Sequence, residues 1–401
     1  MSSATTRAPL PMFRNGHSIV NLAATIGRRF GAQDTPASLG ALGNPVLADA
    51  LQRSHCVVLL LLDGVGCAQI EAIRPDGALA ASRICELDST FPSSTAPAVT
   101  SFATGLAPGA HAVTGWHLWS SEHQAIVRPL PLDIRGHPGQ VSPDMLFDWS
   151  PLSARIDATM TVLQPASIAD SAFSRHAFSG ARRIGYSKPD ALRRLIVEAA
   201  SQARSDPHYV YAYLPQFDSS AHEYGWTSAR SAQVLQTFDT LFAALSADLR
   251  NTDTLLLATA DHGFIDVPPE QLLRLESFPA IAARLSAPLT GEPRVAFCHL
   301  RPGSEDEFAS AVAQSPGFEF DCWESEALIE AGCFGPIADD SATLRQRVGS
   351  HTLIARDRFC VLQTLPGEKP LTFVGMHGGI HRDELRVGVS ATLGGRSLME
   401  N

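Results

Sequence analysis

The sequence predicts an α/β fold: a three-layer sandwich with a mostly parallel central sheet, plus a smaller inserted α+β cap. Residues 55–62, 209–214 and 254–259 are continuous apolar runs of strand length, which is typical of strands buried on both faces. Residues 190–203 and 228–249 have helical periodicity and alternate with these runs. Strands that alternate with helices favour a parallel sheet covered by helices on both sides.

The elements follow in chain order. The first fifty residues are rich in Ala, Pro and Ser, and predict one or two short helices before the first strand. Residues 268–370 change character, with frequent Pro and Gly and a short amphipathic piece at 305–314. Residues 372–376 again read as a strand, directly before His377. We therefore expect a catalytic core formed by residues 15–267 and 371–401, with 268–370 inserted as the cap.

Composition limits the possible functions. The 401 residues are 45% hydrophobic and 18% charged, which excludes wholesale disorder. The formal net charge of -10 argues against a stable nucleic-acid partner, because such proteins need a cationic face. A small anionic substrate held by bound metal ions remains compatible with it. The seven cysteines lack CxxC spacing and predict core residues rather than disulfides or a zinc knuckle.

No apolar run is long enough to span a bilayer, and residues 1–18 lack the apolar centre of a secretory signal. These observations predict a cytoplasmic protein without a membrane partner. The oligomeric state stays open.

Acidic residues follow each of the three apolar strands, at Asp63, Asp218 and Asp261. One such Asp is ordinary, since Asp is common in turns and at helix N-caps. In open α/β sheets, however, ligands bind outside the carboxyl ends of the strands. Three acidic residues in equivalent places therefore indicate a binding site there.

Histidines accompany these carboxylates. Asp218 and His222 are four residues apart, so a helical turn would place them on one face, although an ordinary surface pair would have the same spacing. Asp261 and His262 are adjacent and can share an ion only where the strand end is irregular. His377 lies in a glycine-rich segment, and the charged run after His381 reads as solvated surface, with a supporting role for His381 left open.

A hydroxyl-rich segment at 89–104 predicts the start of a helix, which ends at Gly105. A hydroxyl at a helix N-terminus is well placed as a nucleophile, because backbone N–H groups there face an incoming anion. The plainer alternative is that Ser94 or Thr95 only caps the helix.

Taken in order, these motifs resemble the alkaline phosphatase superfamily, and within it the type I phosphodiesterase/nucleotide pyrophosphatase branch, with phosphonoacetate hydrolase as a close relative. The resemblance covers residues 55–120, 208–266 and 372–382. It implies two divalent metal ions, usually zinc, although manganese or iron would suit the same ligands. By this resemblance one ion is held by Asp218, His222 and His377, and the other by Asp63, Asp261 and His262 with Thr95 beside it.

The resemblance also implies that Thr95 is the catalytic nucleophile and binds metal. Members place the nucleophile nine residues before the Thr of a Thr-Gly-Leu motif, here Thr104, which favours Thr95 over Thr90; Ser94 is a lesser candidate. One position departs from the family: Trp116 occupies the place of an Asn that donates to a phosphoryl oxygen. We expect Trp116, with His117 and Trp119, to affect substrate binding, although packing would equally explain these aromatic residues.

The expected function is two-metal hydrolysis of phosphodiesters or nucleotide pyrophosphates through a phospho-threonine intermediate. The partner would be a small phosphate ester. Alternatives on the same site are a phosphonate or phosphomonoester hydrolase and a phosphotransferase. An inactive metal-binding scaffold is a further alternative, against which the complete ligand set argues. The Cys/Ser-x-Pro-x-Arg motif of sulfatases is absent at the nucleophile position.

Overall fold

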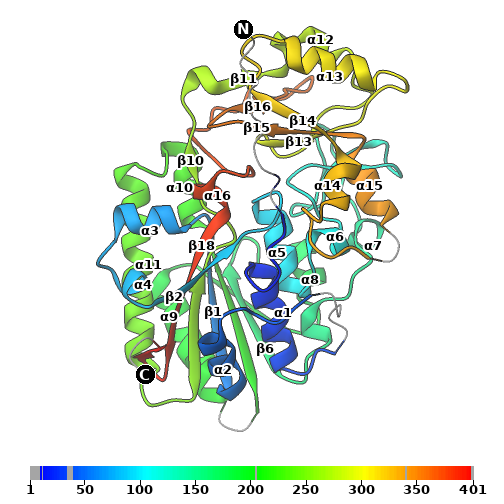
Figure 1. Ribbon diagram of the computed structural model, residues 1–401. Coiled ribbons are helices and arrows are strands. Elements are labelled where there is room, and N and C mark those ends of the chain that lie inside the picture. The colour runs from blue at the N-terminus through cyan, green and yellow to red at the C-terminus, as the bar shows by residue number, and fades with distance from the viewer. Residues whose placement is uncertain (1–9, 11, 34–38, 204–205, 339–340, 399–401) are drawn as a thin grey trace.

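A central sheet of long buried strands organises the lower part of the molecule (Figure 1). The computed structural model describes residues 10, 12–33, 39–203, 206–338 and 341–398. Within these residues the strand order is β19-β18-β9-β1-β8-β6-β7, and β2 pairs with β18. The strands are β1 (Cys56–Leu62), β2 (Arg83–Asp88), β6 (Thr159–Pro165), β7 (Arg182–Tyr186), β8 (His208–Leu214), β9 (Thr254–Thr259), β18 (Arg386–Leu393) and β19 (Arg396–Ser397).

The centre of this sheet is parallel. Strand β1 pairs in parallel with β8 on one side and β9 on the other, whereas β18 runs antiparallel to β9 and β2. Every residue of β1, β8 and β9 is buried, which explains their continuous apolar sequences. The predicted mostly parallel sheet is therefore confirmed.

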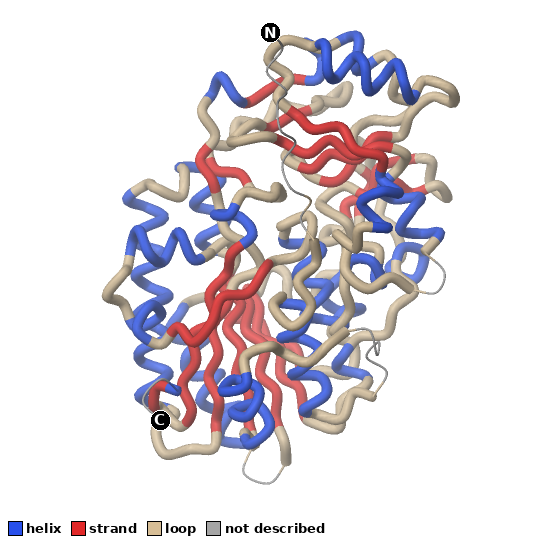
Figure 2. Tube along the Cα trace, in the orientation of Figure 1, coloured by secondary structure: helices blue, strands red, loops and turns tan. Residues whose placement is uncertain are grey.

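Helices cover both faces of the sheet, so the core has three layers (Figure 2). Helices α9 (Pro189–Gln202) and α11 (Ala229–Asp248) lie on one side, and α1 (Ile19–Arg29) and α5 (Thr95–Thr104) lie on the other. The helices predicted at 190–203 and 228–249 are confirmed to within one residue at each end. With α2 (Pro45–Arg53), α1 supplies the short helices expected before the first strand.

A second, antiparallel sheet lies above the carboxyl ends of the core strands in Figure 1. Its order is β12-β13-β15-β14, with helices α12 to α15 packed around it. Its own hydrophobic cluster includes the fully buried Phe308 and Leu353. These elements are β12 (Thr290–Gly291), β13 (Val295–Cys298), β14 (Phe320–Glu324), β15 (His351–Ala355), α12 (Pro279–Ala282), α13 (Glu305–Gln314), α14 (Ser325–Glu330) and α15 (Ala342–Val348). We call residues 268–370 the cap; its exact limits stay a prediction.

Smaller elements complete the described chain. The short sheets are β3 (Leu118–Ser120) with β4 (Ala125–Arg128) and β5 (Asp133–Ile134), β10 (Ile265–Asp266) with β17 (Gly375–Met376), and β11 (Leu272–Arg274) with β16 (Cys360–Leu362). The remaining α-helices are α3 (Cys67–Ile73), α4 (Ala78–Ala81), α6 (Pro108–His111), α7 (Pro143–Leu146), α8 (Ala172–Ala177), α10 (Gln216–Tyr224) and α16 (Arg382–Leu385).

The strand predicted at 372–376 is only partly present. Just Gly375 and Met376 form a strand, and it pairs with β10 rather than with the central sheet. The reason is that this segment lies against α10: the Val374 N–H donates to the His222 carbonyl, and the Gly375 carbonyl contacts the His222 ring. The return to the central sheet is made by β18 instead.

The cysteines agree with the sequence expectation of core residues without disulfides. All seven cysteines are free thiols, five of them buried and two half-buried. In the described part of the chain, no helix has the length and apolarity needed to cross a membrane.

Candidate active site

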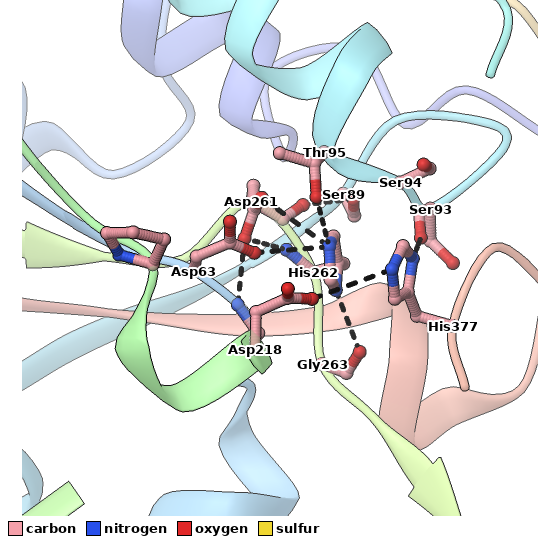
Figure 3. A network of polar contacts seen from close by, with 12 residues as sticks. Asp63, Ser89, Ser93, Ser94, Thr95, Asp218, Asp261, His262, Gly263 and His377 are labelled. Atoms are coloured by element: carbon pink, nitrogen blue, oxygen red, sulfur yellow. Dashed lines mark hydrogen bonds and ion pairs between the residues drawn. The ribbon is translucent and has the colours of Figure 1, made fainter. Parts of the chain in front are cut away.

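The carboxyl ends of β8, β1 and β9 bring the three predicted carboxylates to one edge of the sheet. Asp63 follows β1, Asp218 lies in the first turn of α10 after β8, and Asp261 follows β9. Because β1 lies between β8 and β9, these side chains converge, as Figure 3 shows. Thr95 is the first residue of α5, and His377 follows β17.

Two glycines allow the chain to turn tightly here. Gly64, directly after Asp63, has a φ of 76°, which glycine adopts without steric cost. A Cβ on Gly263 would lie 2.0 Å from the Asp383 carbonyl oxygen, so only glycine permits this approach. The irregular backbone after β9 turns both Asp261 and His262 toward the same site.

Two clusters have ligand atoms that all lie within 4.8 Å of one another. One comprises Asp63, Asp261 and His262, and the other Asp218, His262 and His377. The first matches the set predicted from sequence. In the second, His262 takes the place expected for His222, whose Nε2 nevertheless lies 3.3 Å from Asp218 Oδ1. His262 therefore stands between the two clusters, and its ring stacks on that of His377 with centroids 3.7 Å apart.

The three imidazoles share one hydrogen-bonding pattern. Their Nδ1 atoms contact backbone carbonyls: His222 with Gly375 at 2.9 Å, His262 with Gly263 at 3.0 Å and His377 with Ser93 at 3.2 Å. A carbonyl can only accept, so each Nδ1 carries the proton. Each Nε2 then presents its lone pair toward the carboxylates. This is the state in which histidine binds metal ions.

The pKa values of His377 and His222 are shifted in opposite directions. Burial, together with the neighbouring rings of His262 and His222, holds the pKa of His377 well below its usual range, so His377 is neutral near pH 7. Burial also lowers the pKa of His222, but the adjacent Asp218 outweighs it and the net pKa is raised. The same contact lowers the pKa of Asp218 against the raising effect of burial.

The carboxylates have oxygen atoms without partners. Asp63 Oδ1, Asp218 Oδ1 and Asp261 Oδ2 are buried and accept no hydrogen bond from any described residue. Burial and the charges of Asp261 and Asp218 raise the pKa of Asp63 well above its usual range. Buried unpaired carboxylates are unfavourable unless cations compensate them. The single Nε2 lone pair of His262 can serve only one ion. The residues present therefore fit two divalent cations if Asp63, Asp261 and His262 hold one, and Asp218 and His377 hold the other together with His222.

Only one of the three candidate hydroxyls contacts these clusters. Thr95 Oγ1 lies 3.1 Å from His262 Nε2. The Ser94 hydroxyl donates instead to Glu292 Oε1 and makes no capping hydrogen bond, although Ser94 occupies the N-cap position. The Thr90 hydroxyl donates to the Pro92 carbonyl at 2.8 Å. The geometry thus places Thr95, rather than Ser94 or Thr90, at the metal-ligand clusters.

A cavity of about 520 Å³ opens onto these residues between core and cap. Trp116 and His117 line it, whereas Trp119 packs against His299. Four basic residues also line it: Arg128, Arg135, Arg274 and Lys369. Arg128 and Arg135 are already in ion pairs, with Asp133 and Glu368, so positive charge for an anionic molecule in the cavity would come mainly from Arg274 and Lys369.

The sequence did not point to Glu292, which also lines the cavity. It is 6% exposed and accepts a hydrogen bond from the Trp116 N–H at 2.6 Å. A single glutamate between Gly291 and Pro293 has the local signature of a solvated turn, so only the docking of the cap reveals its burial.

The charged run after His381 was predicted to be solvated, and for Glu384 that is wrong. Glu384 is fully buried and forms a double hydrogen-bonded ion pair with Arg294 of the cap, at 2.7 and 2.9 Å. His381 caps the short helix α16, since its Nδ1 accepts from the Asp383 N–H at 3.2 Å, and it belongs to neither ligand cluster of the described residues.

Comparison with known proteins agrees with this arrangement. The sequence matches the type I phosphodiesterase / nucleotide pyrophosphatase family over residues 57–380. The chain belongs to this family. Its members are metal-dependent hydrolases, and the two ligand clusters are candidate metal sites of such an enzyme. None of the curated proteins matches the sequence.

Solved structures of ectonucleotide pyrophosphatase / phosphodiesterase 5 have a similar fold. Murine ectonucleotide pyrophosphatase / phosphodiesterase 5 matches with a TM-score of 0.64 and 16% identity, covering 84% of this chain and 87% of the murine one. An inactive variant of the murine protein, with a threonine changed to alanine, is similar to the same extent and contains AMP. The human protein matches with a TM-score of 0.61 and 15% identity over the same shares. The predicted alkaline-phosphatase-like fold is thus confirmed.

Proposed function

We propose that this protein hydrolyses phosphodiesters or nucleotide pyrophosphates with two divalent cations, zinc being the first choice, through a phospho-threonine intermediate at Thr95. The observation that carries the proposal is the position of Thr95 Oγ1, 3.1 Å from the histidine shared by two clusters in which each aspartate keeps one buried oxygen without a hydrogen bond. Membership in a family of phosphodiester hydrolases supports the reaction type.

The ligands for the cations would be drawn from Asp63, Asp218, His222, Asp261, His262 and His377, with Thr95 between the clusters. When bound, the two cations would lower the pKa of the attacking hydroxyl and neutralise charge on the leaving oxygen. The neutral state of His377 and the fixed Nδ1–H tautomers keep the ring nitrogens ready for this role.

The proposed reaction has two steps, each of which forms one bond to phosphorus and breaks another. Thr95 Oγ1 forms a bond to phosphorus while the bond to the leaving oxygen breaks, and the threonine proton ends on the released group. Water then forms a new bond to phosphorus, the bond to Thr95 breaks, and a proton returns to its oxygen. The N-terminal N–H groups of α5 face the incoming phosphoryl oxygens, because Thr95 begins that helix.

The cavity supports an anionic substrate of moderate size. Arg274 and Lys369 of the cap line it together with Arg128 and Arg135 of the core, while Trp116 and Phe373 offer apolar surface. The AMP bound to the inactive murine relative suggests a nucleotide among the substrates to be tested.

The test combines metal analysis with a substrate screen. Purified protein should contain about two equivalents of transition metal per chain and should hydrolyse p-nitrophenyl diesters and dinucleoside pyrophosphates. Chelation should abolish turnover, and added zinc should restore it. Full activity after exhaustive chelation would overturn the proposal. Product analysis in the presence of an added alcohol separates hydrolysis from phosphoryl transfer, because a transferase would form a new ester.

A further inference from the structure

The cap contributes one carboxylate to the wall of the catalytic cavity. Glu292 lies in the turn between β12 and β13, and its Oε1 accepts hydrogen bonds from the Ser94 hydroxyl and the Trp116 N–H. Ser94 directly precedes Thr95, so Glu292 contacts the residue next to the nucleophile. The side chain is thereby held in place from two sides.

Further contacts place Glu292 close to the predicted metal ligands. A Cβ on Gly378, the residue after His377, would lie 2.7 Å from Glu292 Cβ, so this backbone packs directly on the glutamate. The charges of Glu292 and of Asp218 and His222 affect one another's pKa values, which requires them to be near. Glu292 therefore lies at the end of the cavity where the reacting phosphoryl group would bind.

No basic side chain of the described residues forms an ion pair with this carboxylate. No Lys, Arg or His nitrogen of the described residues lies within an ion-pair distance of Glu292, whereas Glu384 is paired with Arg294 in the same region. Burial raises the pKa of Glu292 to about 7, and the two hydrogen bonds that it accepts lower it. The carboxylate thus stands in the cavity wall without an ion-pair partner from the described residues, an arrangement that is unfavourable for stability alone.

The charge of the substrate determines how strongly the Glu292 carboxylate repels it. A phosphodiester carries one negative charge, whereas a phosphomonoester loses a second proton near pH 6 and carries about two. A fixed carboxylate repels the dianion more strongly than the monoanion. The hydrogen bond from the backbone N–H of Trp116 holds this carboxylate in the cavity wall.

We propose that Glu292 sets the preference of this site for phosphodiesters over phosphomonoesters. The inference rests on the proposed function and goes further, because it selects one substrate class by charge. Glu292 acts here as a specificity-determining residue of the cap on chemistry that the core performs.

Glu292→Gln tests the charge while keeping the side-chain shape. The amide oxygen can still accept from Ser94 and Trp116, so the local structure should persist. At a pH well above 7, kcat/KM of the holoenzyme is compared for p-nitrophenyl phosphate and methyl p-nitrophenyl phosphate, which share a leaving group. We expect the monoester value to rise roughly tenfold and the diester value to change by less than about threefold, as for removal of one nearby charge.

Glu319→Gln is the matched control, because Glu319 pairs with Arg356 on the cap and does not line the cavity. It should leave the ratio of the two kcat/KM values unchanged. If Glu292→Gln lowers both substrates equally, or leaves their ratio as in the wild type, the inference is wrong and the glutamate only supports the fold.

A binding measurement separates this inference from the proposed function. In a Thr95→Ala background, the affinity for inorganic phosphate relative to dimethyl phosphate is measured by calorimetry, with and without Glu292→Gln. The additional substitution should favour phosphate roughly tenfold, whether or not the wild type turns over any ester. An unchanged relative affinity would overturn the inference even if the enzyme is an active diesterase; failure of turnover alone would overturn only the proposed function.

Discussion

The central sheet and the cap sheet differ in whether their polar side chains have hydrogen-bonding partners. In the cap, polar side chains on the sheet are paired: Arg356 contacts Asp321 at 2.6 Å, and the hydroxyls of Ser325 and Thr352 lie 2.8 Å apart. At the carboxyl edge of the central sheet, three aspartates each retain a buried oxygen atom that accepts no hydrogen bond from the described residues. Paired groups stabilise a fold, whereas a cluster of unpaired groups is retained for a ligand. The comparison therefore locates function in the core and a shaping role in the cap.

Two residues of the cap cross this division. Arg294 of the cap is fully buried and paired with Glu384 of the core, while Glu292, two residues earlier, is buried without a cation. The same hairpin thus attaches the cap to the core through Arg294 and adds a carboxylate to the cavity wall through Glu292. Three substitutions sharpen this contrast, and we take them from the largest expected effect to the smallest.

Thr95→Ala should have the largest effect. Turnover should fall by several orders of magnitude, because no other candidate hydroxyl contacts the ligand clusters. The free energy of unfolding should change by only about 1 kcal/mol, as for the loss of one hydrogen bond. Steady-state kinetics and urea unfolding measure the two quantities. Thr90→Ala is the control, since its hydroxyl contacts only the Pro92 carbonyl. If Thr95→Ala kept near-normal turnover while Thr90→Ala lost it, the assignment of Thr95 as the nucleophile would be wrong.

His377→Ala should remove about one metal equivalent and nearly all turnover, because His377 belongs to the cluster with Asp218 and His262. His381→Ala should keep both ions and lose only about 1 kcal/mol of stability, as expected for a helix cap. Elemental analysis of the two variants, purified side by side, gives the answer. The reverse ranking in metal content would contradict the site described here.

Glu384→Gln tests the anchor between cap and core. It leaves Arg294 as an uncompensated buried charge, so we expect a loss of about 3–5 kcal/mol in the free energy of unfolding. Glu326→Gln breaks an exposed pair with Arg345 and should change stability by less than about 1 kcal/mol. Chemical denaturation of both variants measures the difference. Equal, small losses would mean that the buried pair does not hold the cap on the core.

The sequence predicted those parts whose signals are local. Strand β1 is apolar at every position because both of its faces are covered, and the acidic residue at its end follows directly. Asp218 and His222 share a face because α10 supplies the helical turn that their spacing required.

Parts that depend on tertiary contacts were not predictable in the same way. Glu292 and Glu384 have the local sequence of solvated turns, and both are buried only because cap and core meet there. His262 falls in both ligand clusters because its ring stacks on His377, a contact between segments far apart in the chain. The strand predicted at 372–376 formed only in part, since α10 takes its backbone hydrogen bonds.

The position of β1 in the middle of the sheet also constrains how the chain folds. Strand β1 pairs with β8 and β9, so the first of these pairings closes a loop on the order of 150 residues. Such long-range pairings form slowly, because the entropy of closure is lost before the contacts are gained. During synthesis the apolar residues of β1 therefore precede both of their neighbours by a long stretch of chain. A nascent chain of this topology depends on protection from aggregation until residues 254–259 have emerged, and its catalytic edge assembles only after that.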